Sequence, residues 1–158
     1  MTFAIRHAEP TDYPQIIAVV DAWWGGRRMA DMLPKLFFVH FRPTSFVAED
    51  GGEVVGFLAG FRSQTSPDQA YIHFVGVDPT RRKAGVARAL YERFFEAARA
   101  LGCREVHGVT SPVNRTSIAF HRAMGFELLP GDAEVDGIPY APDYDGRGEP
   151  RVRLRKIL

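Results

Sequence analysis

Several features that define other classes of protein are scarce or missing in this chain of 158 residues. A single cysteine, Cys103, excludes an intrachain disulfide and a C-x-x-C metal site, and the scattered histidines lack metal-ligand spacing. No apolar run reaches the ~18 residues that span a bilayer, and the first residues lack the apolar core of a signal peptide. We therefore expect a cytoplasmic protein with no metal and no membrane partner.

An excess of charge of either sign is also absent. The chain has 20 Lys and Arg against 19 Asp and Glu, a formal net charge of +1. General nucleic-acid binders usually carry a strong basic excess, so we expect no nucleic-acid partner. The basic residues are nevertheless grouped, in one cluster of Arg81, Arg82, Lys83 and Arg88 and a second of Arg115 and Arg122. Local clusters in a nearly neutral chain indicate a discrete anionic ligand.

Familiar nucleotide-binding and metal-binding motifs are missing as well. The sequence has no G-x-x-x-x-G-K-[ST] and no G-x-G-x-x-G after a strand, which argues against a P-loop NTPase and a dinucleotide-binding fold. It also has no H-E-x-x-H and no EF-hand loop. A phosphate ligand must therefore bind through a different arrangement.

The hydrophobic pattern predicts a single domain over residues 1–158, of α/β or α+β class, with a mixed sheet and helices on its faces. We expect about seven strands, at residues 3–7, 45–49, 53–61, 71–77, 105–110, 126–129 and 151–157. We expect about four helices, at residues 11–25, 28–41, 84–101 and 114–124. Residues 130–150 are rich in Pro, Gly and Asp, and read as a long loop with or without a short hairpin.

The segment of residues 75–87 is the most informative. It reads as the end of an apolar strand, a stop at Pro79, a basic turn with one glycine at Gly85, and the start of an amphipathic helix. The first N–H groups of a helix have no intrahelical partner, and a glycine lets a ligand approach the backbone closely. The order therefore predicts a site for an anion such as a pyrophosphate.

Two motifs carry a resemblance to a known family. The pattern Val77-x-Pro79-x-x-Arg82-x-x-Gly85-Val86-Ala87, before a long helix, resembles the acetyl-CoA signature of the GCN5-related N-acetyltransferase (GNAT) superfamily. The pattern Asn114-x-x-Ser117-x-x-Phe120-x-x-x-x-Gly125-Phe126 resembles its second signature. The two motifs span residues 71–126, and the predicted element order is similar to that of the family across almost the whole chain.

The resemblance implies an acetyl-CoA-dependent N-acetyltransferase, which transfers an acetyl group directly to an amine of a small molecule or to a peptide N-terminus. The alternative is a non-catalytic acyl-CoA-binding module that regulates a partner, and a further one is transfer of a longer acyl group or transfer to an oxygen nucleophile. Dimers are common in the family, so a homodimer is among the expected states, although nothing in the sequence decides the oligomeric state.

The resemblance also implies a set of cofactor contacts. The main chain of residues 75–77 would pair with pantetheine in a gap that a bulge opens, and a glycine at position 76 suits close backbone approach. The expected contacts are Val75, Gly76 and Val77 for pantetheine, and Arg82, Lys83, Ala84, Gly85, Val86, Ala87 and Arg88 for the pyrophosphate. In the second signature Asn114 would contact the pantetheine arm, cap the helix or do both, and Ser117 is assigned to the same cofactor contacts.

For the chemistry, the N–H of Val75 would polarise the thioester carbonyl. His121 occupies the position where the family usually places a tyrosine that protonates the leaving thiolate. A protonated imidazole could act as that acid, a neutral one could donate a hydrogen bond to the sulfur, and a surface histidine would do neither.

The general base is expected on the strand before the phosphate turn. An alkylammonium must lose a proton before it attacks, and His73 is the best candidate to accept it. Tyr71 stands where some family members carry a carboxylate; it is a poor base and would help to order water. Both side chains would share a strand face with Val75 unless a bulge intervenes.

Three further features of the sequence can have a structural or a functional role. Trp23 and Trp24 either pack against the core or form an aromatic wall that selects an apolar amine. Residues 130–150 form a solvated loop, a lid over the acceptor site or part of a dimer contact. Cys103 follows a helix end with no activating partner in sight, so we interpret it as a structural thiol.

Overall fold

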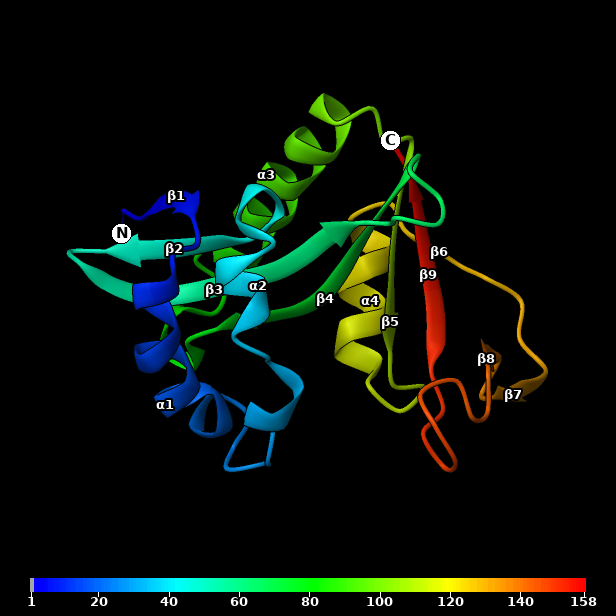
Figure 1. Ribbon diagram of the computed structural model, residues 1–158. Helices are drawn as coiled ribbons and strands as arrows, with labels where there is room; N and C mark the ends of the chain where they lie inside the picture. The colour runs from blue at the N-terminus through cyan, green and yellow to red at the C-terminus, as the bar shows by residue number, and fades with distance from the viewer. Residues whose placement is uncertain (1) are drawn as a thin grey trace.

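A seven-stranded mixed sheet forms the centre of the computed structural model, which describes residues 2–158 (Figure 1). β4 and β5 run parallel, and every other neighbouring pair is antiparallel. In spatial order the strands are β1 (Ala4–His7), β2 (Phe46–Asp50), β3 (Glu53–Arg62), β4 (Gln69–Val77), β5 (Glu105–Thr110), β9 (Val152–Ile157) and β6 (Glu127–Leu128). The seven strands predicted from the sequence are therefore confirmed, with ends shifted by at most two residues.

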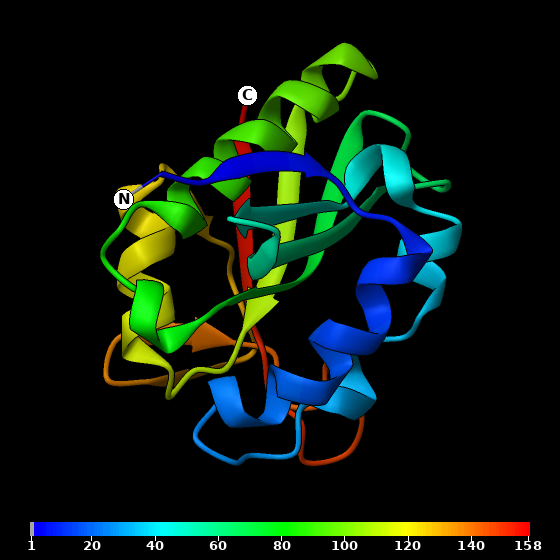
Figure 2. The ribbon, with the colours of Figure 1, turned by 90° about the vertical axis from the view of Figure 1, so that its left-hand side faces the viewer.

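Four helices cover the two faces of the sheet. They are α1 (Tyr13–Trp23), α2 (Leu36–Val39), α3 (Val86–Ala100) and α4 (Arg115–Ala123). Figure 2 shows α4 on one side of the strands and α1 with α2 on the other, while α3 crosses the sheet at the top of the view. The predicted mixed α/β architecture is thus confirmed.

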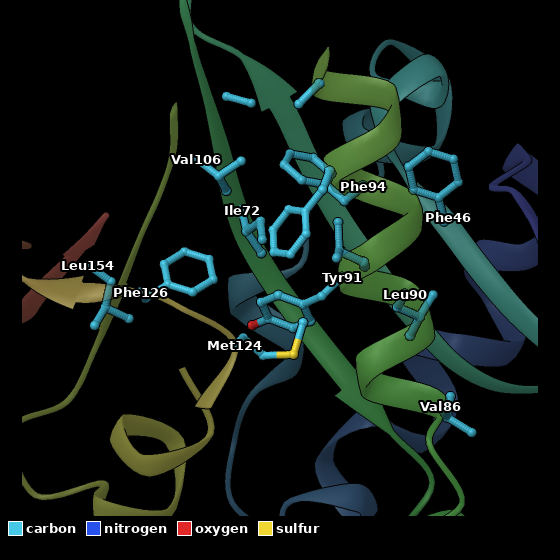
Figure 3. Packing of buried hydrophobic residues seen from close by; sticks show 14 of the residues in the cluster. Phe46, Ile72, Val86, Leu90, Tyr91, Phe94, Val106, Met124, Phe126 and Leu154 are labelled. Atoms are coloured by element: carbon cyan, nitrogen blue, oxygen red, sulfur yellow. The ribbon is translucent and has the colours of Figure 1, made fainter. Parts of the chain in front are cut away.

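Two hydrophobic clusters, one on each face, hold these layers together. The larger cluster packs α3 and α4 onto the sheet, and its α3 residues Val86, Leu90 and Phe94 recur at four-residue spacing (Figure 3). The smaller cluster packs α1 and α2 onto β2, β3 and β4. Leu90 and Phe94 are fully buried in the first, and Ile16 and Val20 of α1 are fully buried in the second.

The helix predicted at residues 28–41 is wrong in extent. The structure has a 3₁₀ turn at Ala30–Met32, the short α2, and a second 3₁₀ turn at Arg42–Thr44. Pro34 explains the break, because a proline has no N–H to donate and forces the residue before it out of the helical region. Leu33 accordingly adopts φ −120° and ψ 82°.

Residues 130–150 contain a short hairpin, the first of the two forms expected for this segment. β7 (Ala133–Val135) pairs with β8 (Ile138–Tyr140) around Asp136-Gly137, both of which have positive φ as a tight two-residue turn requires. A loop of residues 141–151 follows, and its ends are joined by paired hydrogen bonds between Ala141 and Arg151. Arg151 also pairs with Asp145 at 2.8 Å, so the loop is closed by its own side chains.

A β-bulge in β4 switches the faces to which its side chains point. Ala59 pairs with Phe74 and Gly60 with Ile72, which leaves His73 without a partner residue on β3. Ile72 accordingly packs into the α3 cluster, whereas Phe74, two residues on, packs into the α1 cluster. The bulge that the resemblance implied for this strand thus lies at His73 and not at Gly76, the position that suited close backbone approach.

The start of α1 is held by a buried carboxylate, which makes folding stability depend on pH. Asp12 is 3% exposed, accepts two hydrogen bonds from Arg6 at 2.8 and 2.9 Å, and accepts a third from the Glu9 N–H at 2.8 Å. Burial by itself raises the pKa of Asp12, but the hydrogen bonds and charge of Arg6 and the Glu9 N–H outweigh it, so its pKa is lowered.

We expect Asp12→Asn to lower the free energy of unfolding by about 2 kcal/mol at pH 7, because it replaces a buried carboxylate that accepts charge-assisted hydrogen bonds from Arg6. A lowered native pKa stabilises the fold above the unfolded value of ~3.9 and stops doing so as pH falls through the native value. The difference between wild type and variant should therefore shrink below about pH 4. Urea unfolding measures it, and Asp31→Asn, in an exposed ion pair with Arg28, is the control.

Candidate active site

The parallel strands β4 and β5 separate partway along their length. Their pairing covers only three residues of each strand and ends at Tyr71 opposite His107. Beyond that point Figure 1 shows the two strands diverging toward the bottom of the view. The β4 backbone from Ile72 to Val77 thus has β3 on one side and no strand on the side toward β5. Main-chain groups on this edge are open to pair with an extended ligand.

The turn that follows β4 presents backbone N–H groups at the start of α3. Lys83 and Gly85 both have positive φ, of 68° and 84°, and they turn the chain sharply into the helix. Within residues 2–158 the N–H groups of Gly85, Val86, Ala87 and Arg88 donate no backbone or side-chain hydrogen bond, as expected for the first turn of a helix. They form a row of free donors at the positive end of the helix dipole.

The basic side chains of this turn have different tasks. Arg81 forms an ion pair with Asp50, which ties the turn to the β2–β3 hairpin. Arg82 donates to the carbonyl of Trp23 at 3.1 Å and so ties the turn to α1. The Arg88 guanidinium lies 3.8 Å from Glu92 in an exposed pair that contributes little to stability. Lys83 and Arg88 are therefore the cations that an anion at this turn would meet with least rearrangement.

The packing around Gly76 explains the glycine. A Cβ added there would lie 2.5 Å from Cε1 of Phe57 and 3.0 Å from Cη2 of Trp24. The close approach inferred from the sequence is thus made by aromatic rings of the protein on the α1 side. The β4 main-chain groups that face β5 lie along the edge of the strand and not on the face covered by these rings. Gly76 can therefore pack against the rings and still leave that edge open.

Asn114 and Ser117 lie where β5 gives way to α4, beside the separated strands. Asn114 is the N-cap residue of α4, and its side-chain oxygen accepts a hydrogen bond from the Ser117 N–H at 3.1 Å. The capping role of Asn114 anticipated from the sequence is therefore present. The Ser117 hydroxyl accepts a hydrogen bond from Thr110 Oγ1, at the end of β5, over 3.0 Å.

His121 points into the protein, and both its ring nitrogens are engaged. Nδ1 lies 2.7 Å from the carbonyl oxygen of Ser117, and Nε2 lies 2.9 Å from the hydroxyl of Tyr91 on α3. A carbonyl only accepts, so Nδ1 carries the proton and Nε2 accepts from Tyr91. Burial lowers the pKa of His121, more than the Ser117 carbonyl raises it. In this arrangement neither nitrogen of His121 is free to donate a hydrogen bond to a sulfur atom. The acid role considered for His121 from the sequence requires such a free donor.

His73 is half-buried on the opposite side of the sheet from α3. Its Nε2 lies 2.6 Å from the carbonyl oxygen of Met32, and its ring stacks on Phe37 with centroids 4.7 Å apart. Since the carbonyl must accept, Nε2 carries the proton and Nδ1 of the neutral ring keeps a lone pair. The imidazole is thus held in one orientation with a basic nitrogen available.

Tyr71 lies on the same side as His73, whereas the side chain of Val75 packs toward α3. The bulge at His73 therefore separates Val75 from the other two, which was one of the two possibilities left open by the sequence. Burial, together with nearby Tyr144 and Asp145, raises the pKa of Tyr71 to about 12. Its phenol stays protonated at neutral pH and is suited to hydrogen bonding, not to accepting a proton.

Aromatic side chains surround this part of the α1 face. Trp23 is buried and stacks on Phe57, so it belongs to the core. Trp24 is half-buried with its ring 5.0 Å from that of Phe74, and it remains accessible from outside. His73 forms its aromatic ring pairs with Phe37 and Phe74. The half-buried aromatic residues on the same face of the sheet are Tyr13, Trp24, Phe41, Phe61 and Tyr71.

Three elements of the site have no clear sequence signal. Tyr91 reads as one more apolar position of α3, yet its hydroxyl contacts His121, 30 residues away. Thr110 reads as a strand end, yet its hydroxyl contacts Ser117. The loop of residues 141–151 brings the Tyr144 and Asp145 side chains close enough to Tyr71 to affect its pKa. These contacts arise from chain packing and not from a local pattern.

Other kinds of site find little support in the part of the chain that the structure describes. Residues 2–158 contain no group of three or more His, Cys, Asp or Glu that could hold a metal ion. No helix among the same residues is both long and apolar enough to cross a membrane. Cys103 is buried, and this burial raises the pKa of its thiol, as suits a structural cysteine.

Comparison with known proteins supports the resemblance seen in the two motifs. The model of the acetyltransferase (GNAT) family matches residues 4–126. An L-2,4-diaminobutyric acid acetyltransferase of Nocardia farcinica is 34% identical over 84 residues, which are 53% of this chain and 44% of the relative. The chain spans about half the length of the first curated relatives that it matches.

Solved structures show the same fold at low sequence identity. The Ard1 protein of Thermoplasma volcanium superposes with a TM-score of 0.80 at 20% identity, covering 100% of this chain and 99% of that one. The diaminobutyrate acetyltransferase EctA of Paenibacillus lautus, solved with L-2,4-diaminobutyric acid and coenzyme A, superposes with a TM-score of 0.67 at 21% identity, covering 97% and 94%. With the family model matching most of its length, this chain is a member of the GNAT acetyltransferase family.

Proposed function

We propose that this chain is an acetyl-CoA-dependent N-acetyltransferase that acetylates an amine of a small molecule or a peptide N-terminus. The observation that carries the proposal is the separation of β4 from β5 beside a row of free N–H groups at the start of α3. An open strand edge suits the amide-containing pantetheine arm, and the helix start suits a pyrophosphate. Both halves of coenzyme A therefore have a matching surface at adjacent positions.

In this proposal the cofactor contacts follow the sequence assignment. Pantetheine lies along Val75, Gly76 and Val77 of β4. The pyrophosphate lies on the turn of residues 82–88, with Lys83 and Arg88 supplying charge. On the far side of the separated strands, Asn114 and Ser117 at the start of α4 border the pantetheine arm. The N–H of Val75 stabilises the negative charge that develops on the thioester oxygen.

The reaction is a direct acyl transfer. The neutral amine forms a bond to the thioester carbon, and the resulting tetrahedral intermediate expels the CoA thiolate as the carbonyl re-forms. His73 removes the proton that the attacking amine must lose, through its free Nδ1 or an intervening water. Tyr71 remains protonated and hydrogen-bonds the amine or that water.

The relatives and the aromatic side chains of the site each point to a class of acceptor amine. Relatives named for L-2,4-diaminobutyric acid make a small diamino acid the first acceptor to test. The aromatic side chains on the face of the sheet that carries His73 suggest an apolar or aromatic amine as the second. We further expect the protein to act in the cytoplasm, with a homodimer as one of its states, and to bind neither nucleic acid nor membranes.

Two measurements test the function. Calorimetric titration with acetyl-CoA should give saturable binding, and thiol release from acetyl-CoA should rise when a panel of amines and peptides is added. Absence of binding at millimolar acetyl-CoA contradicts the proposal. Tight binding without turnover on a broad amine panel would favour the alternative of a regulatory acyl-CoA-binding module. The structural reason to test this alternative is that both ring nitrogens of His121 are engaged.

A base role for His73 predicts a specific loss of activity. In His73→Gln, the side-chain amide can still donate to the Met32 carbonyl, but no basic nitrogen remains. We expect kcat/KM for the amine to fall about 100-fold, and the pH–rate profile to lose the inflection of the base. Acetyl-CoA binding should stay unchanged. An unaltered pH–rate profile would remove His73 from the mechanism.

A further inference from the structure

A chain of hydrogen bonds runs from the interior of the α3 cluster to the separated strands. Tyr91 on α3 contacts His121 on α4 at 2.9 Å, and His121 contacts the Ser117 carbonyl at 2.7 Å. His121 Nδ1 also lies 3.3 Å from the Ser117 hydroxyl, and Thr110 Oγ1 on β5 lies 3.0 Å from the same hydroxyl. Figure 3 shows the Tyr91 hydroxyl directed away from α3, toward Met124 at the end of α4.

The directions of these hydrogen bonds follow from the chemistry of the groups. The Ser117 carbonyl can only accept, so His121 Nδ1 carries a proton and Nε2 accepts from Tyr91. The same Nδ1–H points at the Ser117 hydroxyl oxygen, which also accepts from Thr110. With Thr110 Oγ1 and His121 Nδ1 donating to it, the Ser117 oxygen can turn its own proton toward a ligand.

The position of Ser117 places this proton beside the reacting groups of the proposed function. β4 and β5 are parallel and last paired at Tyr71 and His107, and the bulge adds one residue to β4, so Thr110, three residues beyond His107, stands about level with Val75, four residues beyond Tyr71. Ser117 contacts Thr110, and its side chain is half-buried on the side that carries α3 and α4. It therefore faces the separated strands at the level of Val75, the residue proposed to bind the thioester carbonyl.

We propose that the Ser117 hydroxyl, and not the His121 imidazole, donates the hydrogen bond that stabilises the CoA sulfur as it leaves. The inference rests on the proposed function. The C–S bond of the tetrahedral intermediate breaks, its electron pair moves to sulfur, and the carbonyl re-forms. The amine proton goes to the base, and CoA leaves as a thiolate that accepts the Ser117 O–H, so no further acid is needed. His121 and Tyr91 are positioning residues that hold Ser117.

The test measures the CoA thiol directly. A donor to sulfur stabilises the thiolate, so bound CoA in the wild type should have a thiol pKa below that of free CoA. In Ser117→Ala the thiol pKa of bound CoA should return toward the free value, as followed by ultraviolet absorbance of the thiolate. Turnover should fall about 10- to 100-fold in kcat, with KM for acetyl-CoA changing less than about threefold.

Matched variants separate the donor role from a structural one. Thr116→Ala removes the neighbouring hydroxyl from the exposed side of α4 and should leave the thiol pKa as in the wild type. Ser117→Thr retains a hydroxyl, so the thiol pKa of bound CoA should stay at its lowered, wild-type value. Tyr91→Phe removes the hydroxyl that donates to His121 and leaves Ser117 in place. It should move the thiol pKa of bound CoA in the same direction as Ser117→Ala, by a smaller amount.

The outcomes distinguish this inference from the function on which it rests. Equal thiol pKa values for CoA bound to wild type and to Ser117→Ala overturn the donor role, whatever the turnover. A lowered thiol pKa that depends on Ser117, in a protein that acetylates no amine, supports the donor role and contradicts the proposed transferase activity.

Discussion

Gly85→Val is expected to weaken acetyl-CoA binding by about 100-fold, or about 2.7 kcal/mol. Gly85 has φ +84°, and a Cβ built on it meets no atom within 4 Å, so the space above this residue is open. In the proposed complex the pyrophosphate occupies that space against the free N–H groups of α3. A valine side chain would fill it and would also strain the left-handed backbone that aims the N–H groups.

Gly102, at the other end of α3, supplies a matched control. It has φ +87°, and a Cβ there also meets nothing within 4 Å. Gly102→Val should therefore cost a similar amount of folding free energy, about 2 kcal/mol, while acetyl-CoA binding stays at the wild-type level. Calorimetric titration of both variants, with thermal unfolding alongside, makes the comparison. Equal affinities for acetyl-CoA in the two variants would place the pyrophosphate elsewhere.

Gly60→Ala should produce the largest loss of stability, about 3 kcal/mol, or a melting temperature lower by roughly 6–12 °C. A Cβ at Gly60 would lie 2.5 Å from Cε1 of Phe94 and 2.9 Å from the backbone oxygen of Tyr71. Phe94 is fully buried, and Tyr71 belongs to the neighbouring strand, so neither can move without disturbing the core or the sheet. Gly60 also sits where the bulge in β4 begins.

The control is Gly108→Ala, another glycine within a strand of the same sheet. A Cβ there would lie 3.5 Å from its nearest neighbour, the backbone oxygen of Ile72, which is an ordinary contact. We expect Gly108→Ala to change the free energy of unfolding by less than about 1 kcal/mol in either direction, because a smaller unfolded-state entropy offsets any crowding. Urea unfolding of the two variants tests the difference. A Gly60→Ala protein as stable as Gly108→Ala would show that the core around Phe94 yields easily.

Elements with strong local signals could be predicted from the sequence. The turn between β4 and α3 is one, because proline, glycine and the onset of helical periodicity act within a few residues of each other. The β2–β3 hairpin is another, because Gly51 and Gly52 follow each other at its turn. Both adopt the positive φ that favours glycine. The second helix could not be predicted in the same way, because Pro34 admits either a kink or a break and the packing of Phe37 and Phe38 decides between them.

The candidate site also depends partly on local sequence and partly on packing. The residue types at positions 71, 73, 117 and 121 can be read from the sequence, but whether their polar atoms are free to contact a ligand cannot. Whether His121 is free depends on Tyr91 of another helix, and whether Val75 shares a face with His73 depends on one unpaired residue in β4. A one-residue bulge reverses the alternation of side chains, and no local pattern announces it.

By itself the sequence determined the order of the strands and helices, the turn of residues 82–88 that leads into α3, and the family to which the two motifs point. These depend on interactions between residues close together in the chain. Only the tertiary structure decided that β4 parts from β5 after Tyr71, that both ring nitrogens of His121 are engaged, and that Ser117 contacts Thr110. These depend on contacts such as the one between Tyr91 and His121, which form only when distant segments pack together.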